Sequence, residues 1–373
     1  MKKTWIFIVM LICTVAATVA FSATAFAAKT AGTAYYVSSS TGNDNNDGKS
    51  ELTPWKTLNR VNATVFSPGD SILLKTGDTW EEELILHGNG AVGDTLLPIT
   101  LSSYGNEGRP IIAPGGTDRT CLTINGLEGW EIRGLELCNA YQGILISYHD
   151  VFEKDYLSIS DCYIHNINRE FNSNPQESGR YKYNHFSSGI AIRGWMAGDN
   201  GYIPGAINLP LEEPPVGSIH LSRLLIDSVE FEDCDAGIWM CKDDIANTAQ
   251  MGYFSEASFS NLTFRYCGMW GYSLKNLYNS TVYNCDCFDS GTVPVWCGSC
   301  SGLVESCIKV TLDGCDIYCA NRDPAQSYDG CGFDFEAWNY DVTYKNAVID
   351  GTDGCGIFVF DNGLGNINDK LAI

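Results

Sequence analysis

Two carboxylates stand two positions apart in the segment Gly332-Phe333-Asp334-Phe335-Glu336-Ala337-Trp338. The alternation of apolar and acidic residues predicts a β-strand that buries Phe333 and Phe335 and turns Asp334 and Glu336 to the opposite face. Their α-carbons are then about 6.6 Å apart, and their carboxyl groups can reach the separations of roughly 5 to 9.5 Å used in glycosidic bond cleavage. One protonated carboxyl would donate to the glycosidic oxygen while the other, ionised, activates water or attacks carbon. The like charge and burial beside tryptophan would help to raise one of the two pKa values.

Shorter segments repeat this pattern, and each reads glycine, large apolar, variable, large apolar. These segments are Gly143–Ile146, Gly189–Ile192, Gly237–Met240, Gly271–Leu274 and Gly356–Val359. We interpret them as equivalent strands of stacked coils, which places the acidic segment on the outer face of the stack. Counted from each glycine, the second positions are Leu145, Ala191, Trp239, Ser273, Asp334 and Phe358, and the fourth are Ser147, Arg193, Cys241, Lys275, Glu336 and Phe360.

Regular stacking would place these outer positions in lines, because neighbouring coils lie about 4.8 Å apart. With Val293–Trp296 as a further coil, Lys275, Trp296 and Glu336 form one line and Asp334 lies beside it. Acidic, basic and aromatic groups together form a groove suited to sugars. The catalytic candidates are Asp334, Glu336 and Lys275, with Asp329 and Asp361 as candidates for a third carboxylate. The candidate substrate-binding residues are Arg193, Trp239, Trp296, Trp338, Phe358 and Asp361.

The composition favours a β-rich protein that does not bind polyanions. The chain has 373 residues and a formal charge of −22, which argues against nucleic acid or an anionic membrane as a partner. With 38 glycines, 19 tyrosines, 9 tryptophans and only 18% charged residues, it suits an all-β fold with many turns and an aromatic surface.

The first 27 residues have the pattern of an export signal. Lys2 and Lys3 precede an apolar run, and Ala25-Phe26-Ala27 forms a cleavage site, so we expect a signal peptide removed after Ala27 and a secreted product. No later stretch is long and apolar enough to span a bilayer. We divide the remainder into an N-terminal cap with the first coils, residues 28–118, and a body carrying the cleft, residues 119–373.

Cysteine is abundant, with 16 in the chain. Five of them precede strand glycines at a similar distance, which predicts a buried ladder of small apolar groups. They are Cys138, Cys234, Cys267, Cys315 and Cys331. Cys297 with Cys300, and Cys285 with Cys287, are instead spaced for local disulfides, since no matching pair at zinc-finger spacing accompanies them.

Short alternating segments punctuated by Gly, Asn, Asp and Cys predict coils of about three strands each. A short helix over residues 54–61 would cap one end, and the longest loops are residues 168–186 and 195–222. The predicted strands are residues 35–38, 71–74, 96–101, 122–124, 130–137, 157–164, 224–231 and 257–264.

The turn Gly42–Gly48 is rich in short oxygen ligands. Its Asp44 and Asp47 are compatible with a calcium loop, because hard cations favour carboxylate and amide oxygens. A plain Asx-turn needs the same residues and no ion.

The N-terminal motifs carry a family resemblance. The segments Tyr35–Ser38, Pro54–Leu58, Pro68-Gly69-Asp70, Gly77–Trp80 and Pro98-Ile99-Thr100, with the glycine-bounded turn above, resemble the opening of secreted right-handed parallel β-helix proteins of the pectin-lyase-like superfamily. The resemblance implies a solenoid with an N-terminal cap, protruding loops and an extracellular polysaccharide or oligosaccharide as substrate.

Within that superfamily, Asp334 and Glu336 are similar to the D-x-D pair of polygalacturonase-like hydrolases. They depart from it by having Glu second and no adjacent Asp-Asp in the aligned row. The first hypothesis is therefore a glycoside hydrolase that needs no cofactor. In the second, a calcium-dependent polysaccharide lyase, Lys275 is the base, Arg193 the clamp, and the two carboxylates hold calcium.

Two further alternatives involve no catalysis. A glycan-binding solenoid would use the same aromatic groove, and Asp334 and Glu336 could instead pair with Lys275 in a solvated ion-pair network. We interpret His165, His185 and His220 as structural, because they lack nucleophile or metal spacing.

Overall fold

The computed structural model describes residues 32–116, 118–167, 187–195, 211–242, 251–291, 299–321, 329–360 and 368–373. Residues Ala31–Ile373 form one compact unit. The predicted signal peptide, residues 1–27, lies outside the described residues. None of the helices among the described residues has the length and apolar character needed to cross a membrane.

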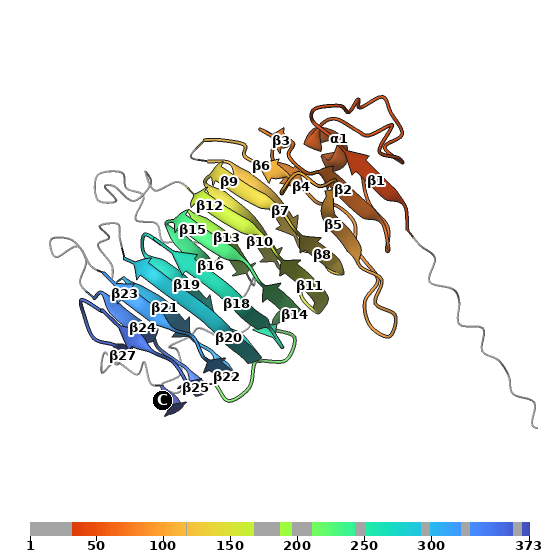
Figure 1. The fold of residues 1–373 in the computed structure, drawn as a ribbon. Coiled ribbons are helices and arrows are strands. Elements are labelled where there is room, and N and C mark those ends of the chain that lie inside the picture. Colours follow the sequence, from red (N-terminus) through yellow and green to blue (C-terminus); the bar gives the residue numbers. More distant parts are fainter. Residues whose placement is uncertain are drawn as a thin grey trace, which may run out of the picture. The chain divides into compact units, whose positions relative to one another are not determined.

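Parallel strands stack along the chain in a 19-stranded sheet and a nine-stranded sheet (Figure 1). The larger sheet has two faces joined through β18 and β20, which we call the first and second sheets, and the nine-stranded sheet is the third. The first sheet contains β1 (Ala34–Val37), β2 (Ser71–Lys75), β5 (Ile99–Tyr104), β8 (Trp130–Arg133), β11 (Lys154–Ser160), β14 (Ile219–Asp227), β17 (Tyr253–Ser255), β18 (Ser258–Arg265), β20 (Leu277–Ser290), β22 (Ile308–Asp313), β25 (Tyr340–Lys345) and β28 (Asp369–Ala372). The second contains β3 (Thr79–Trp80), β6 (Ile111–Ile112), β9 (Glu136–Ala140), β12 (Tyr163–Ile167), β15 (Glu230–Cys234), β23 (Ile317–Ala320) and β26 (Ile349–Asp350), and it shares β18 and β20. The third contains β4 (Leu84–Ile85), β7 (Thr120–Asn125), β10 (Gln142–His149), β13 (Ser188–Trp195), β16 (Ala236–Lys242), β19 (Trp270–Lys275), β21 (Cys300–Glu305), β24 (Cys331–Phe335) and β27 (Ile357–Val359).

This arrangement confirms the all-β, parallel β-helix prediction. Each strand pairs with its counterpart one coil away, and all of these pairings are parallel. Strands β1, β2 and β5 of the expected N-terminal segment already belong to the sheet that continues through β8 and β11.

The corner between the first and second sheets explains the frequent Gly, Asn and Asp. Successive coils place one residue with positive φ at this corner, where glycine and short polar side chains are tolerated best. These residues are Gly134, Asp161, Ser228, Asn261, Asn284, Gly314 and Asn346, with φ between 50° and 71°.

The glycines that begin the strands of the third sheet are required by close packing. A Cβ on Gly237 would lie 2.3 Å from a ring carbon of Phe264 and 2.4 Å from the carbonyl oxygen of Gly271. The large apolar residues after the glycines point into the core, where Phe231 stacks on Phe264 with ring centroids 4.8 Å apart. The repeated segments are therefore equivalent strands, as predicted.

The predicted N-terminal helix is shorter than expected. Helix α1 (Leu58–Asn62) begins after Thr57, whose side chain accepts a hydrogen bond from the Arg60 N–H. Residue 55 cannot join the helix, because the Trp55 N–H donates to Tyr36 and its carbonyl accepts from Ser38.

The second predicted loop, residues 195–222, is longer at both ends than the structure allows. Trp195 belongs to β13 and Ile219 begins β14, whose Leu221 pairs with Lys154 of the preceding coil. Residues 168–186 and 196–210 lie outside the described part of the chain.

The single cysteine ladder is wrong, although the five cysteines are buried as predicted. Cys138 pairs with His165, and Cys331 pairs with Cys300 in the third sheet. The spacing to the next glycine misled the prediction, because residues at that spacing come from different sheets. The predicted disulfide between Cys285 and Cys287 is also wrong, because both thiols are free, and Cys297 is not among the described residues.

Truncating Phe333 tests the packing beneath the candidate site. Its ring is fully buried and stacks on Tyr344 with centroids 4.3 Å apart. We expect Phe333→Ala to lower the free energy of unfolding by about 3 to 5 kcal/mol, because it removes buried contacts and leaves a cavity. Urea denaturation followed by circular dichroism measures this loss. Phe358→Ala is the control, since that ring is 37% exposed, and equal losses would contradict the packing argument.

Candidate active site

The strand register brings the two carboxylates into neighbouring lines on the third sheet. Asp334 has Leu303 on one side and Phe358 on the other as its paired residues. In the next line Lys275 pairs with Glu305, and the Glu336 N–H donates to the Val304 carbonyl at 2.9 Å, so Glu336 follows Glu305. Asp334, Phe358, Lys275 and Glu336 therefore occupy the predicted lines.

The position between Lys275 and Glu336 that was predicted for Trp296 is taken by Glu305 of β21. The sequence analysis did not find Glu305, because this coil has Ser301 at the position where the other coils have glycine. Its glycine, Gly302, stands one residue later and lies opposite Tyr272 and Phe333. A Cβ on Gly302 would lie 2.6 Å from the Tyr272 ring, so that ring fills the space. Trp296 itself lies outside the described residues.

Asp334 is more enclosed than the sequence predicted. Its side chain turns away from the core, as expected, but the residue is only 4% exposed. The thiols of Cys300 and Cys331 approach its carboxylate, with the candidate ligand atoms all within 4.8 Å of one another. Among the described residues, Asp334 Oδ1 is buried without a hydrogen-bond partner. Two soft, weakly polar groups therefore replace the solvent that would stabilise the charged form.

The surroundings separate the pKa values of the two carboxyl groups. Burial, reinforced by the charge of Glu336, raises the pKa of Asp334 to about 8. Burial and Glu305 raise the pKa of Glu336 to about 6, while Lys275 and the Ala337 N–H oppose that rise. At pH 7 Asp334 is then protonated and Glu336 is largely ionised. This is the division that acid–base cleavage of a glycosidic bond requires.

Lys275 is held as a cation. Its ammonium group pairs with Glu305, and the two side chains are 28% and 25% exposed. Burial alone would lower the pKa of Lys275, but the charge of Glu305 and the hydrogen bond to it outweigh that effect and raise the pKa. The ammonium group therefore acts as a fixed positive charge beside Glu336.

Asp329 is a further carboxylate near this pair. Burial raises the pKa of Asp329, and its charge raises the pKa values of both Asp334 and Glu336. Four carboxyl groups thus surround one ammonium group in this region, which favours retention of a proton by the most buried of them.

The predicted substrate-binding residues spread along the sheet. Arg193 lies on β13, and Trp239 on β16 is only 3% exposed, with its ring 6.3 Å from that of Trp270. Phe358 is 37% exposed beside Asp334, and Trp338 follows β24 in a left-handed conformation at φ 63°. Asp361, like Trp296, is not among the described residues. Phe358 and Trp338 are therefore the predicted aromatic residues nearest in register to the carboxylates.

The turn at Asp44 and Asp47 is held by the chain's own donors. Asp44 accepts hydrogen bonds from the N–H groups of Lys56 and Thr57 and from Thr57 Oγ1. Asp47 accepts from Lys49 N–H and Thr53 Oγ1. The contact from Asp47 to Lys49 is an Asx-turn, and the contacts of Asp44 anchor the residues just before α1, so a calcium ion would have to displace both sets.

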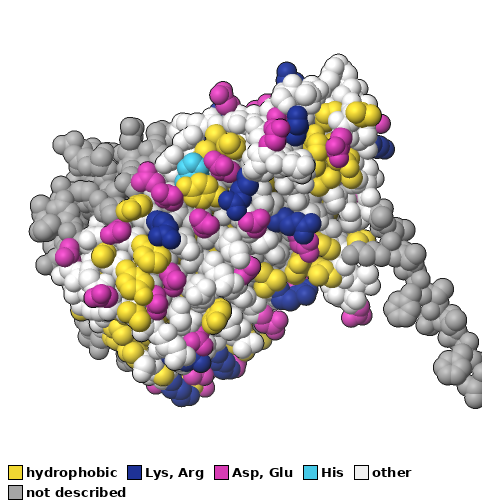
Figure 2. Space-filling model, viewed as in Figure 1, with side chains coloured by type: hydrophobic (Ala, Val, Ile, Leu, Met, Phe, Trp, Pro, Cys, Tyr) yellow, Lys and Arg dark blue, Asp and Glu magenta, His cyan; other side chains and the backbone are white. Residues whose placement is uncertain are grey.

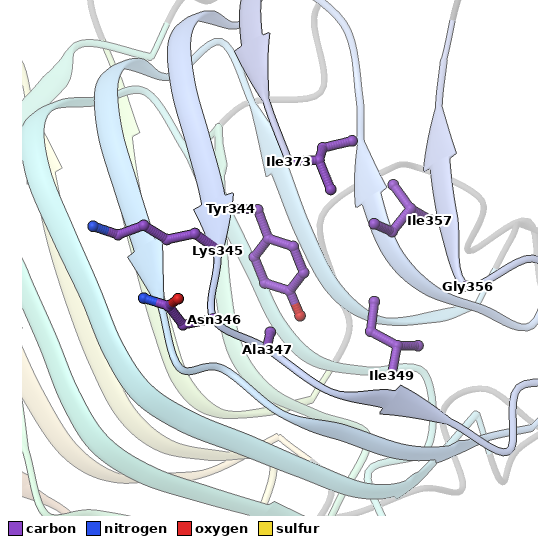
Figure 3. A pocket seen from close by; sticks show the side chains of 8 residues that line it. All are labelled: Tyr344, Lys345, Asn346, Ala347, Ile349, Gly356, Ile357 and Ile373. Carbon is purple, nitrogen blue, oxygen red and sulfur yellow. The ribbon is translucent and has the colours of Figure 1, made fainter.

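A separate pocket of about 480 Å³ opens at the last coils (Figure 3). Tyr344, Ile349 and Ile357 point into it, and these residues continue the core rather than the outer lines of the third sheet. The pocket is therefore distinct from the carboxylate pair.

Replacing Asp334 with asparagine should stabilise the fold as pH rises. An unfolded Asp loses its proton near the ordinary pKa of 3.8, whereas folded Asp334 keeps it to about pH 8. Between these values the folded state binds the extra proton, so this group lowers the free energy of unfolding by about 1.4 kcal/mol per pH unit. We expect the stability advantage of Asp334→Asn to grow from pH 4 to pH 8 and then level off.

Thermal melts of both proteins across that pH range measure this effect. Asp227→Asn is the opposite control, because a hydrogen bond from Ser260 lowers the pKa of Asp227. That variant should lose stability relative to the parent above pH 4. A constant difference for Asp334→Asn would show that its carboxyl titrates normally in the folded protein.

Comparison with known proteins agrees with this architecture. Residues 217–370 match the family model described as a right-handed beta helix region. The native crystal structure of GH136 lacto-N-biosidase from Eubacterium ramulus superposes with a TM-score of 0.63 and 14% identity, covering 91% of this chain and 68% of that chain. Its selenomethionine derivative gives a TM-score of 0.53. The protein is a right-handed parallel β-helix.

A second comparison gives a higher sequence identity over a shorter part of the chain. Lacto-N-biosidase of Bifidobacterium longum subsp. longum is 47% identical over 89 residues, which form 23% of this chain and 6% of that protein. The aligned part is thus a small fraction of that enzyme.

Proposed function

We propose that this protein is a glycoside hydrolase that acts on an oligosaccharide or polysaccharide along the outer face of the third sheet. Asp334 is the general acid that protonates the departing glycosidic oxygen. Glu336 is the ionised partner that activates water or attacks the anomeric carbon. Hydrolysis of this kind requires no cofactor.

The observation that carries this proposal is the unequal surroundings of two carboxyl groups in neighbouring lines of the third sheet. Asp334 is 4% exposed with its Oδ1 unpartnered among the described residues, whereas Glu336 interacts with the ammonium of Lys275. These surroundings raise the pKa of Asp334 to about 8 and that of Glu336 to about 6. Two carboxyl groups on one strand would titrate alike in water. At pH 7 the more buried Asp334 keeps its proton, whereas Glu336 has lost most of its own. The ammonium of Lys275 supports the ionised form of Glu336.

The two lacto-N-biosidases to which the chain is similar suggest the substrate class. We infer that the substrate is a neutral oligosaccharide, of the kind a lacto-N-biosidase cleaves. The acidic balance of the chain agrees with an uncharged ligand, and acidic side chains are spread over the face in Figure 2. The signal pattern in residues 1–27 would export the enzyme to meet such a substrate.

The lyase alternative is less favoured. Its base, Lys275, would have to be uncharged to remove a proton, whereas the pair with Glu305 keeps the ammonium form. The two carboxylates would also have to be ionised together to hold calcium, against the raised pKa of Asp334.

Replacing Lys275 with methionine separates the two mechanisms. A hydrolase should stay active near pH 7, but the acid limb of its pH–rate profile should move upward, because Glu336 loses a stabilising charge. A neighbouring opposite charge commonly shifts a carboxyl pKa by about 1 to 3 units, so we expect the rate at pH 5 to fall by about tenfold. A lyase with Lys275 as base would lose activity at every pH.

Lys154→Met is the matched control for that experiment. Lys154 also pairs with a glutamate, Glu128, at 3.0 Å and is 24% exposed, but it lies on the first sheet. Its loss should leave the pH–rate profile unchanged.

The function is tested by incubating the protein with a chromogenic lacto-N-bioside and with a panel of neutral and uronic-acid polysaccharides. Reducing ends and near-ultraviolet absorbance are read together, with and without calcium. New reducing ends without absorbance support hydrolysis. Calcium-dependent absorbance would establish elimination, and saturable binding without turnover would establish a glycan-binding protein.

A further inference from the structure

Glutamate, cysteine and histidine side chains meet on the second sheet, away from the carboxylate pair. Glu136 and Cys138 stand two residues apart on β9, so both side chains point to the same face of that strand. Cys138 is the paired residue of His165 on β12, in the next coil. Two neighbouring coils thus supply three different metal-ligating groups to one place.

The three ligand atoms are already close together. His165 Nε2 lies 3.0 Å from Glu136 Oε1, and those atoms and Cys138 Sγ all lie within 4.8 Å of one another. A tetrahedral zinc ion with ordinary bond lengths would hold such atoms about 3.3 to 3.6 Å apart. The side chains need to move by only about 1 Å, with no change in the backbone pairing of the two strands.

Neighbouring residues orient the imidazole. The Tyr163 ring stacks on it with centroids 4.3 Å apart and an angle of 20° between the planes. The Tyr163 hydroxyl donates to Glu232 at 2.7 Å, and Glu232 is the paired residue of His165 in the following coil. The histidine is therefore held between an aromatic face and two carboxylates, an arrangement that positions a ligand before a metal arrives.

The partial burial of the three side chains suits the binding of a small ion at the protein surface. Side-chain exposure is 16% for His165 and 26% for Glu136, while Cys138 is 4% exposed. A hydrated cation can approach from outside and bind inward to the thiol. Water or Glu232 can then complete the coordination.

We propose that Glu136, Cys138 and His165 form a binding site for a divalent transition-metal cation, with zinc as the ion that fits the donor set. Thiolate, imidazole and carboxylate are the ligands that zinc takes in proteins. On binding, the thiol releases its proton to solvent, and the cation replaces the hydrogen bond between His165 and Glu136. The ion joins β9 to β12 and so cross-links adjacent coils. This inference is independent of the proposed hydrolysis.

A second close group of potential ligands, Cys300, Cys331 and Asp334, belongs to the candidate active site. Among the described residues these are the two groups of three or more such ligands.

The test uses the whole protein, reduced and freed of metal, titrated with Co²⁺ as a spectroscopic substitute for Zn²⁺. We expect one equivalent of bound cobalt with a thiolate-to-cobalt absorption band in the near ultraviolet, and displacement of cobalt by added Zn²⁺. Cys138→Ser should abolish the band. His165→Gln should weaken cobalt binding by more than the roughly 10- to 100-fold that loss of an outer-shell partner costs.

Cys319→Ser is the control, because Cys319 is a free cysteine exposed on the same sheet, and its loss should change nothing. Circular dichroism confirms that each variant folds. In addition, Zn²⁺ should raise the melting temperature of the parent and of Cys319→Ser but not that of Cys138→Ser. Absence of bound cobalt in the parent, a band that survives Cys138→Ser, or an unchanged cobalt affinity in His165→Gln would overturn the proposal.

Discussion

Replacing Asp334 with asparagine is expected to lower the rate of glycosidic bond hydrolysis by about 10²- to 10⁴-fold, the range that a general acid typically contributes. The amide has nearly the same shape but cannot transfer a proton to the departing oxygen. The effect should appear in kcat rather than in KM, because the proton moves in the transition state. Since the residue is 4% exposed and its Oδ1 has no hydrogen-bond partner among the described residues, the amide should also be accommodated in the fold.

The choice of leaving group makes this prediction specific. A sugar alcohol needs protonation to depart, whereas an acidic nitrophenol does not. The loss in Asp334→Asn should therefore be large for a natural oligosaccharide and much smaller for a nitrophenyl glycoside. Asp286→Asn is the matched control, because burial also raises the pKa of Asp286 but the residue lies on the second sheet. Equal losses for both leaving groups would remove Asp334 from the role of acid.

The sequence predicted the fold well because the repeat is enforced by close packing. At five of the repeated glycines a Cβ would meet a backbone oxygen of the next coil, as Gly237 would meet Gly271, and only Gly356 has room for one; the five are Gly143, Gly189, Gly237, Gly271 and Gly332. The apolar positions that follow then face the core at fixed spacing. Counting outward from these glycines was therefore enough to place Asp334 opposite Phe358 and to put Lys275 in line with Glu336.

The same rule failed where one coil is packed differently. In β21 a serine takes the glycine position and Gly302 makes room for the Tyr272 ring. Periodicity read from glycines alone passes over this coil, and with it Glu305, the partner of Lys275. Alternation does not mark this strand either, because Leu303 on its outer face is as apolar as Val304 on its inner face.

The sequence pattern also could not predict how deeply Asp334 is buried. Alternation assigned Asp334 to the outer face but could not indicate that Cys300, Cys331 and Leu303 would enclose it. Cys300 and Leu303 come from the preceding coil, and the sequence had suggested Cys300 as half of a local disulfide. The raised pKa of Asp334 thus depends on contacts between coils, whereas the presence of two carboxylates is a property of one strand.

Glu336→Gln should produce the second large loss. If Glu336 activates water, the rate should fall by about 10²- to 10⁴-fold, and if it attacks carbon directly the fall should be larger. In the parent enzyme the rate should fall below about pH 6 as Glu336 gains a proton, and above about pH 8 as Asp334 loses its own. The residual activity of Glu336→Gln should lack the acid limb and keep the alkaline one.

Added azide tests whether Glu336 acts at the anomeric carbon. In Glu336→Ala, where no side chain fills the space of the carboxylate, a small anion can attack the sugar, which restores turnover and yields a glycosyl azide of inverted configuration. The configuration of the sugar that the parent enzyme releases then separates the two roles. Retention identifies Glu336 as the nucleophile, and inversion identifies it as the base that activates water. Glu305→Gln is the control: it shifts the pH–rate profile through Lys275 but gives no azide product, and the same product from both variants would contradict the assignment of Glu336.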